Sequence, residues 1–341
     1  MRTTGLIILG VVILAALAAP ALSPHGSTQE FRAFLYAPPM RPHVIDEQGK
    51  WHRPFTHPLV LASRLEQRYE EDRSRRVPLE FFSGGVLVRA ADETASPWFP
   101  LGADSYGRDI FARVLYGART SLGVAAVALI ATLLLGLAVG GLAGYLGGAV
   151  DEALMRLAEF ILVLPAIYVV LALRAALPLV LPGWAVFLLM AGIFALVGWP
   201  FVARGVRTIV AAERRREYAV AAVSLGAGHG RMLFRHLLPA SAGFLATQAT
   251  LLVPAFILAE ATLSFVGLGF PEPTPSWGSM LQDAANVTTI GDFPWTLSPA
   301  AAIFVVVLAL NLVVQGSGAS PVSTPAASPG DGRRAAGPAA V

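Results

Sequence analysis

The sequence predicts an all-α membrane protein with six transmembrane helices, and this prediction rests on composition and on the spacing of the apolar runs. Of the 341 residues, 55% are apolar and 14% are charged, which is too apolar a composition for an ordinary soluble domain. A helix that spans a bilayer needs about 20 mostly apolar residues. Runs of this kind occupy residues 3–22, 121–143, 160–182, 184–203, 240–269 and 297–314.

The first run, within residues 1–22, has two interpretations. Arg2 precedes an apolar core, and LAAPALS offers small residues for cleavage, as in a secretory signal peptide. The apolar stretch is long for such a signal, which favours an uncleaved signal anchor that forms the first transmembrane helix. Among the later runs, 160–182 contains a single charged residue, Arg174, and 240–269 contains only Glu260.

The charges of the short loops predict the orientation, because Lys and Arg favour the cytoplasmic side. The loop at 204–239 is rich in arginine, whereas the loop at 270–296 has three acidic residues and neither Lys nor Arg. The first loop is therefore expected inside and the second outside. Counting six spans from these loops places both termini in the cytoplasm and residues 23–118 outside.

The external segment, residues 23–118, is predicted to be a small α+β insertion between the first two transmembrane helices. Alternating stretches with glycine punctuation, at 43–59 and 81–102, suggest hairpins, and the charged stretch at 61–76 suggests a helix. Beyond residue 315 the chain becomes a mixture of Pro, Gly, Ser and Ala that cannot bury a core. Residues 316–341 are therefore expected to form a disordered cytoplasmic tail.

The sequence lacks motifs for catalysis and for a metal or cofactor. It has no GxxxxGK[ST] phosphate loop, no HExxH pair and no cysteine. His43, His52 and His57 have no compact ligand spacing, so they are expected to be solvated surface residues. The arginines are scattered between apolar runs instead of forming one soluble face, which excludes a nucleic-acid partner. We expect no enzyme activity, no cofactor and no metal, and any ATP hydrolysis would belong to separate chains.

Glu260 is the ionisable residue that stands well inside an apolar run. A carboxylate at this depth is costly unless it is protonated, paired or in contact with water. One interpretation is a group on a translocation pathway, and the other is a structural hydrogen bond to a neighbouring helix. The sequence leaves both open.

The arginine-rich loop contains a segment, residues 217–240, with a distinct pattern. Glu217 opens a stretch of Ala and apolar residues at helical spacing, glycines at 226 and 228 interrupt it, and a second helical stretch is expected to end at Pro239. Ala221 and Ala222 give the first helix a flat surface suited to another protein's groove. The alternative is an amphipathic helix that lies on anionic lipid through its arginines.

These residues resemble a known family. AAVSLGAGHGRMLFRHLLP, residues 221–239, is similar to the coupling loop of permease subunits in binding-protein-dependent ABC importers. Further blocks, at 101–122, 144–156, 257–269 and 273–281, are similar to its dipeptide, oligopeptide and nickel branch. The resemblance covers about residues 100–312, and Val220 stands where the family has a glutamate. It implies contacts with an ATPase subunit through Glu217, Ala221, Ala222, Gly226, Leu238 and Pro239.

The resemblance also implies the fold, the function and the partners. Residues 119–315 would form a permease core with five transmembrane helices, lining half of a pathway for short peptides or a related small solute in the bacterial inner membrane. A second permease subunit, two ATP-binding subunits, an external substrate-binding protein and membrane lipid would be its partners. The alternatives are a proton-coupled secondary transporter that uses Glu260 and a membrane-anchored scaffold whose external segment is the working part.

Overall fold

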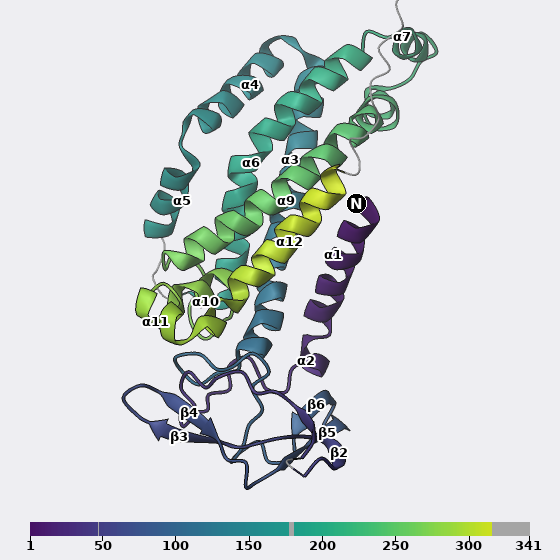
Figure 1. Cartoon of the computed structure of the whole chain (residues 1–341). Helices are drawn as coiled ribbons and strands as arrows, with labels where there is room; N and C mark the ends of the chain where they lie inside the picture. The colour runs from purple at the N-terminus through teal and green to yellow at the C-terminus, as the bar shows by residue number, and fades with distance from the viewer. Residues whose placement is uncertain (47, 177–180, 316–341) are drawn as a thin grey trace, which may run out of the picture.

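The computed structural model describes residues 1–46, 48–176 and 181–315. Long helices lie side by side, with the strands gathered at one end of them and helix α7 at the other (Figure 1). The predicted tail, residues 316–341, lies outside the described residues.

Four helical stretches in the described part of the chain are long and apolar enough to cross a membrane. They are Ile110–Leu146, Gly183–Glu213, His229–Phe265 and Pro294–Val314. The first two stretches are the helices α3 and α6. The third contains α8 (His229–Arg231), the π-helical η1 (Met232–Leu237), the 3₁₀-helical η2 (Leu238–Ser241) and α9 (Ala242–Phe265). The fourth contains η3 (Pro294–Leu297) and most of α12 (Ser298–Gln315).

Helices α3 and α6 pack closely because glycines line the contact. Gly136, Gly140 and Gly144 recur every four residues on one face of α3. A Cβ atom at Gly140 would overlap the carbonyl oxygen of Ala203 on α6. Small residues at this spacing let two membrane helices approach backbone to backbone.

The first run forms α1 (Arg2–Leu17) and the short α2 (Ala19–Leu22), which starts around Pro20. Helix α1 packs against α12, where a Cβ atom at Gly5 would overlap the carbonyl oxygen of Ala309. At its far end, the guanidinium of Arg119 donates to the carbonyl oxygen of Ala16. Helix α1 is therefore fastened to two other helices along its length.

The run predicted at 160–182 is divided between α4 (Gly148–Val163) and α5 (Ala166–Ala175), and residues 177–180 lie outside the described residues. The helix breaks at Leu164, whose backbone is extended, with φ −73° and ψ 122°. Leu164 precedes Pro165, and the proline ring disfavours the helical conformation of the residue before it. The break replaces the single continuous helix that hydropathy predicts.

The insertion consists of antiparallel strands. The strands β1 (His43–Ile45), β2 (Trp51–Thr56), β5 (Val77–Ser83) and β6 (Val86–Ala90) form one sheet in the order β1-β2-β5-β6, and β3 (Leu59–Ser63) pairs with β4 (Arg68–Glu71). The two predicted hairpins are present as β1–β2 and β5–β6.

The α+β description of the insertion is wrong, because residues 61–76, predicted as a helix, contain part of β3 and all of β4. Charged residues give this stretch a helix-like composition. Contacts with distant residues favour strands here in spite of that composition. The Tyr69 ring packs on the cluster around Phe99, and its hydroxyl donates to the carbonyl oxygen of Leu35 at 2.9 Å. In the described residues between α2 and α3, the regular elements are strands.

Candidate functional site

The segment predicted to couple, residues 204–239, includes α7 (Glu217–Ser224), at the end of the long helices opposite the strands (Figure 1). Gly226 ends this helix with φ +82°. Its N–H donates to Val223 O at 2.9 Å, and the N–H of Ala227 donates to Ala222 O at 3.0 Å. This pair of bonds is the Schellman motif, which favours glycine at the left-handed position. The predicted interruption by glycine is therefore present, and we call the turn at residues 225–228 the glycine elbow.

Helix α7 has one packed side and one exposed side. Ala219 is buried against a cluster that contains Val210, Met232 and Leu237, and Ala222 packs on the same cluster. On the other side, Val220 is 58% exposed, Val223 57% and Leu225, at the elbow, 89%. An exposed apolar surface outside the helices of spanning length is a feature of an interaction site.

The structure divides the predicted coupling residues between these two sides. Glu217, Ala221 and Gly226 are exposed. Ala222 and Leu238 instead pack on the cluster beneath α7. Pro239 is exposed, but it belongs to the helical stretch that follows the elbow.

The predicted helix end at Pro239 is wrong, because the chain stays helical from His229 to Phe265. Proline lacks an N–H and its ring crowds the preceding turn, which interrupts a regular α-helix. Here the π-helical turn at Met232–Leu237 and the 3₁₀ turn at Leu238–Ser241 take up the irregularity. The second arm of the elbow is therefore continuous with the long helix that contains α9.

Residues 214–229, which contain α7 and the glycine elbow, form the elbow segment. Polar contacts hold both of its ends to the end of α3. The Tyr145 hydroxyl and His229 Nδ1 are 2.6 Å apart, and the carbonyl oxygen of Tyr145 accepts a hydrogen bond from Arg214. Nearby, Asp151 on α4 pairs with Arg207 on α6, with 2.9 Å between Oδ1 and Nε. Sequence reasoning did not identify these residues, although Tyr145 and Asp151 lie in the family-like block at 144–156.

Glu260 lies apart from the elbow, at a meeting point of α3, α9 and α10 (Trp277–Asp283). It is 0% exposed. Ser121 Oγ on α3 donates to one carboxyl oxygen at 2.7 Å, and Ser264 Oγ donates to the other, also at 2.7 Å. Of the two interpretations left open by the sequence, this geometry fits the structural hydrogen bond.

A cluster of charges, of which Asp104, Arg108 and Arg113 are buried, holds the start of α3 against Glu272 in the loop before α10. Arg108 donates to Asp104 at 2.7 Å and also pairs with Glu272. Arg113, fully buried, lies 3.2 Å from Glu272 and 3.4 Å from Asp104. Three of these residues belong to the family-like block at 101–122, and charges beside an apolar run were the signal that could have found them.

Asp283 lies at the edge of this charge cluster, 3.8 Å from Arg108. Burial, and after it the negative charge of Asp104, raises the pKa of Asp283 to about 6. Glu272 behaves differently, because hydrogen bonds and charges from Arg108 and Arg113 outweigh its burial and hold its pKa below the ordinary value. Asp283 is thus the member whose ionised form the cluster disfavours.

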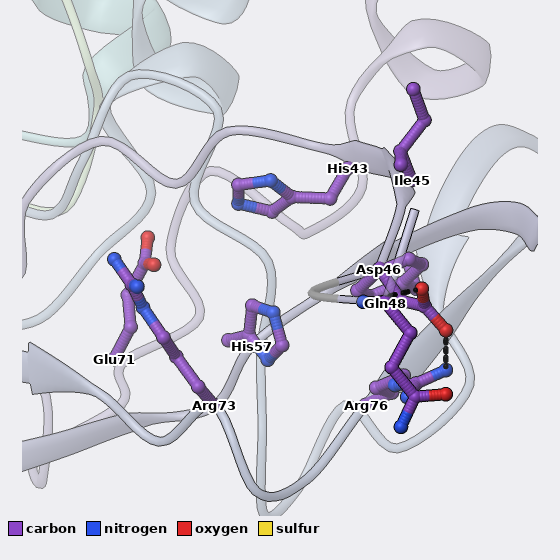
Figure 2. A pocket seen from close by; sticks show the side chains of 9 residues that line it. His43, Ile45, Asp46, Gln48, His57, Glu71, Arg73 and Arg76 are labelled. Atoms are coloured by element: carbon purple, nitrogen blue, oxygen red, sulfur yellow. Dashed lines mark hydrogen bonds and ion pairs between the residues drawn. The ribbon is translucent and has the colours of Figure 1, made fainter. Parts of the chain in front are cut away.

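The insertion contains a polar cavity of about 280 Å³, lined in part by His43, His57, Asp46 and Arg76 (Figure 2). His57 Nδ1 donates to the carbonyl oxygen of Arg75 at 2.8 Å, and Arg76 lies 3.3 Å from Asp46. The backbone hydrogen bond from Lys50, the largest cause, lowers the pKa of Asp46 to about 2. In the described part of the chain no three His, Asp or Glu residues form a group that could hold a metal ion.

Comparison with known proteins matches this chain to membrane components of transport systems. The family described as "Binding-protein-dependent transport system inner membrane component" matches residues 136–319. The dipeptide transport system permease protein DppC of Bacillus subtilis is 38% identical over 282 residues, covering 81% of this chain and 85% of that protein.

Two further relatives have related names. The oligopeptide transport system permease protein OppC of Bacillus subtilis is 37% identical, covering 64% of this chain and 69% of that protein. The nickel transport system permease protein NikC of Escherichia coli is 36% identical, covering 66% of this chain and 78% of that protein.

Proposed function

The chain belongs to the family of binding-protein-dependent transport system inner membrane components, and we propose that it is the permease subunit of an ATP-driven importer. In this proposal it forms half of a translocation pathway for short peptides or a related small solute. The names of the similar DppC and OppC proteins support peptides as the substrate class. A second permease subunit would form the other half, and an external binding protein would deliver the substrate.

The exposed apolar side of α7 is the observation that carries this proposal. Val220, Val223 and Leu225 are exposed, and they lie outside the four stretches of spanning length found among the described residues. Burying such side chains against a partner is favourable in proportion to the apolar area removed from water. An ATP-binding subunit is the partner that the family supplies, and Ala221 allows its surface to come close.

Composition argues against the lipid-surface alternative for α7. Helices that lie on anionic lipid carry Lys and Arg on their polar face. Residues 217–224 contain Glu217 and no Lys or Arg, and the arginines of the loop stand before and after this helix. A protein groove therefore fits α7 better than a lipid surface does.

The proposed topology has six spans, with both termini in the cytoplasm. The long helical stretches would supply four spans, and residues 1–22 and 160–182 the other two. The placement of α7 and of the strands at opposite ends of the helices supports a cytoplasmic elbow and an external insertion (Figure 1). Reporter fusions after Leu101 and Thr289 should give an external signal, and a fusion after Arg215 a cytoplasmic one. A cytoplasmic signal at Thr289 would contradict both the six-span topology and the coupling assignment.

The geometry suggests how a displacement of α7 would be transmitted to the helices that line the pathway. Closure of the ATP-binding subunits would displace α7, and Tyr145 would transmit the displacement because it contacts both ends of the elbow segment. Helix α3 has 37 residues and is roughly 55 Å long at 1.5 Å per residue. It runs from Tyr145 past Ser121 to the buried charge cluster, so a rocking motion at one end would reach the other.

The test is an Ala221→Asp variant compared with Ala221→Ser. Aspartate would place an unpaired charge in the docked surface, whereas serine keeps a small neutral side chain. We expect Ala221→Asp to insert normally, lose co-purification with the ATP-binding subunit and lose peptide uptake in reconstituted vesicles. Ala221→Ser should retain both. Wild-type uptake by the aspartate variant would show that α7 is not the docking surface.

The proton-coupled alternative is not favoured. A proton carrier must reach water from at least one side, but Glu260 is 0% exposed and each carboxyl oxygen accepts a hydrogen bond from a serine. Uptake that follows a proton gradient and continues without an ATP-binding subunit would reverse this conclusion.

A further inference from the structure

A second cavity of the outer region lies between the insertion and the chain that leads into α12. It has a volume of about 610 Å³, within the roughly 300–1,000 Å³ of small-molecule sites. One side is the tip of the β3–β4 hairpin, and the other is the end of α11 (Val287–Asp292) with η3. Figure 1 shows this hairpin beneath α10 and α11. We call this cavity the hairpin cleft.

Aromatic rings form the walls of the hairpin cleft, and their contacts hold them in place. The Phe293 ring stacks on Tyr36, with centroids 4.2 Å apart and planes at 9°. Trp295 Nε1 donates to the carbonyl oxygen of Ala103 at 3.2 Å, and the Tyr69 hydroxyl donates to that of Leu35 at 2.9 Å. These rings are thus fixed before any ligand arrives, which lowers the entropic cost of binding.

Charged side chains of both signs line the same cleft. Arg68 and Glu66 come from the hairpin, and Asp292 comes from the end of α11. No ion pair joins any of the three to another side chain in the described ranges 1–46, 48–176 and 181–315. In the polar cavity of Figure 2, by contrast, Asp46 is already paired with Arg76.

We propose that the hairpin cleft binds a short peptide with free termini. Arg68 would hold the carboxylate, Glu66 and Asp292 the ammonium group, and the rings of Tyr69, Phe293 and Trp295 an apolar or aromatic side chain. A zwitterion matches a cleft with unpaired charges of both signs better than an anion or a cation does. The inference rests on the proposed function only for its place on the outer side, where the cleft would be an accessory site on the permease itself.

The experiment measures peptide binding to the purified full chain in lipid nanodiscs by calorimetry, without binding protein or nucleotide. The probes are alanyl-phenylalanine, its N-acetyl derivative and its C-terminal amide. We expect each blocked form to bind about tenfold more weakly than the free dipeptide, the change that one charge-assisted contact of about 1.4 kcal/mol gives.

Variants of two arginines, Arg68 and Arg64, test which side chain recognises the peptide carboxylate. Arg68→Gln should bind the dipeptide and its amide equally, because the group that recognises the carboxylate is gone, a change that a purely structural role would not produce. Arg64→Gln, in the same hairpin but outside the cleft, should keep the preference of the wild type. Glu66→Gln combined with Asp292→Asn should remove the discrimination against the N-acetyl form.

Several outcomes would overturn the inference. They are no dipeptide binding by the wild type, equal binding of the three probes, and a preference that survives Arg68→Gln. Weaker capture of the external binding protein by Arg68→Gln, without any dipeptide binding, would identify a protein-docking surface instead. Peptide uptake by the whole transporter is measured in parallel: uptake without cleft binding contradicts this inference alone, and cleft binding without ATP-driven uptake contradicts the proposed function alone.

Discussion

Ser121 Oγ on α3 donates a 2.7 Å hydrogen bond to the carboxyl group of Glu260 on α9. The same serine oxygen accepts a hydrogen bond from the backbone N–H of Trp277 on α10 at 3.2 Å. The Ser121 hydroxyl thus connects α3 with both α9 and α10, and the Glu260 residue that it contacts is 0% exposed. Close packing surrounds this connection, since a Cβ atom at Gly278 would approach Ala261 to 2.6 Å. The geometry at Glu260 is that of a structural contact between these helices.

We expect Glu260→Gln to keep assembly and most transport, because the amide retains the shape and can still accept from a serine hydroxyl. Glu260→Ala should be destabilised by about 2–4 kcal/mol, since it leaves a cavity and two buried hydroxyl groups without their acceptor. Thermal unfolding in detergent and peptide uptake measure the two effects. Thr262→Ala, at an exposed position on the same helix, is the control. Complete loss of uptake in Glu260→Gln at normal membrane levels would support a pathway role.

A glycine pair at the elbow tests its backbone geometry. Gly226 has φ +82°, whereas Gly228 has φ −68°, and neither would bring a Cβ atom within 4 Å of another group. Alanine at Gly226 should therefore cost roughly 1–2 kcal/mol through backbone strain alone, and alanine at Gly228 should cost little. We expect Gly226→Ala to weaken association with the ATP-binding subunit and Gly228→Ala to leave it unchanged, as measured by co-purification. Equal behaviour of the two variants would contradict a role for the elbow conformation.

The buried charge cluster predicts a pH dependence of stability. The pKa of Asp283 rises from 3.8 to about 6 on folding, so the folded state keeps a proton that the unfolded state has already released. Stability from this group is present at low pH and is lost as the pH rises through about 6, by on the order of 3 kcal/mol. The charged neighbours that set this balance are Asp104, Arg108, Arg113 and Glu272.

Replacing Asp283 tests this dependence. We expect Asp283→Asn to raise the unfolding temperature at pH 8, where wild-type Asp283 is ionised, and to change it little at pH 4. Glu70→Gln, at an exposed strand position, should show no such pH-dependent gain. An asparagine variant that is less stable than the wild type at pH 8 would show that the 3.8 Å contact with Arg108 outweighs burial.

Hydropathy and glycine spacing predicted the features that depend on local sequence. The long apolar helices and the turn at Gly226 each follow from the period or the backbone freedom of a short stretch. The hairpins of the insertion were also predicted, because glycines mark their turns.

Features that depend on contacts between distant residues were predicted wrongly or not at all. Residues 61–76 have a helical composition, but the contact of Tyr69 with the Phe99 cluster favours strands. Pro239 does not end its helix, because a π-helical turn precedes it. The pairing of Arg108 with Glu272 joins residues 164 positions apart, and no local pattern indicates such a partner.

The final prediction concerns Val220, which the resemblance to the family's coupling loop aligns with a glutamate. Its side chain is 58% exposed on the side of α7 away from the packed cluster, so a longer polar side chain fits without disturbing the fold. We expect Val220→Glu to leave transport intact or to increase the uptake driven by each ATP hydrolysed, because a carboxylate at this position can pair with a cation of the ATP-binding subunit. Val220→Gln, of the same size but neutral, should show a smaller gain. The measurement is the ratio of peptide uptake to ATP hydrolysis in reconstituted vesicles. A glutamate variant that no longer associates with the ATP-binding subunit would mean that the partner's surface at this point is apolar and matched to valine, in which case the family's contact has been replaced by burial of Val220 itself.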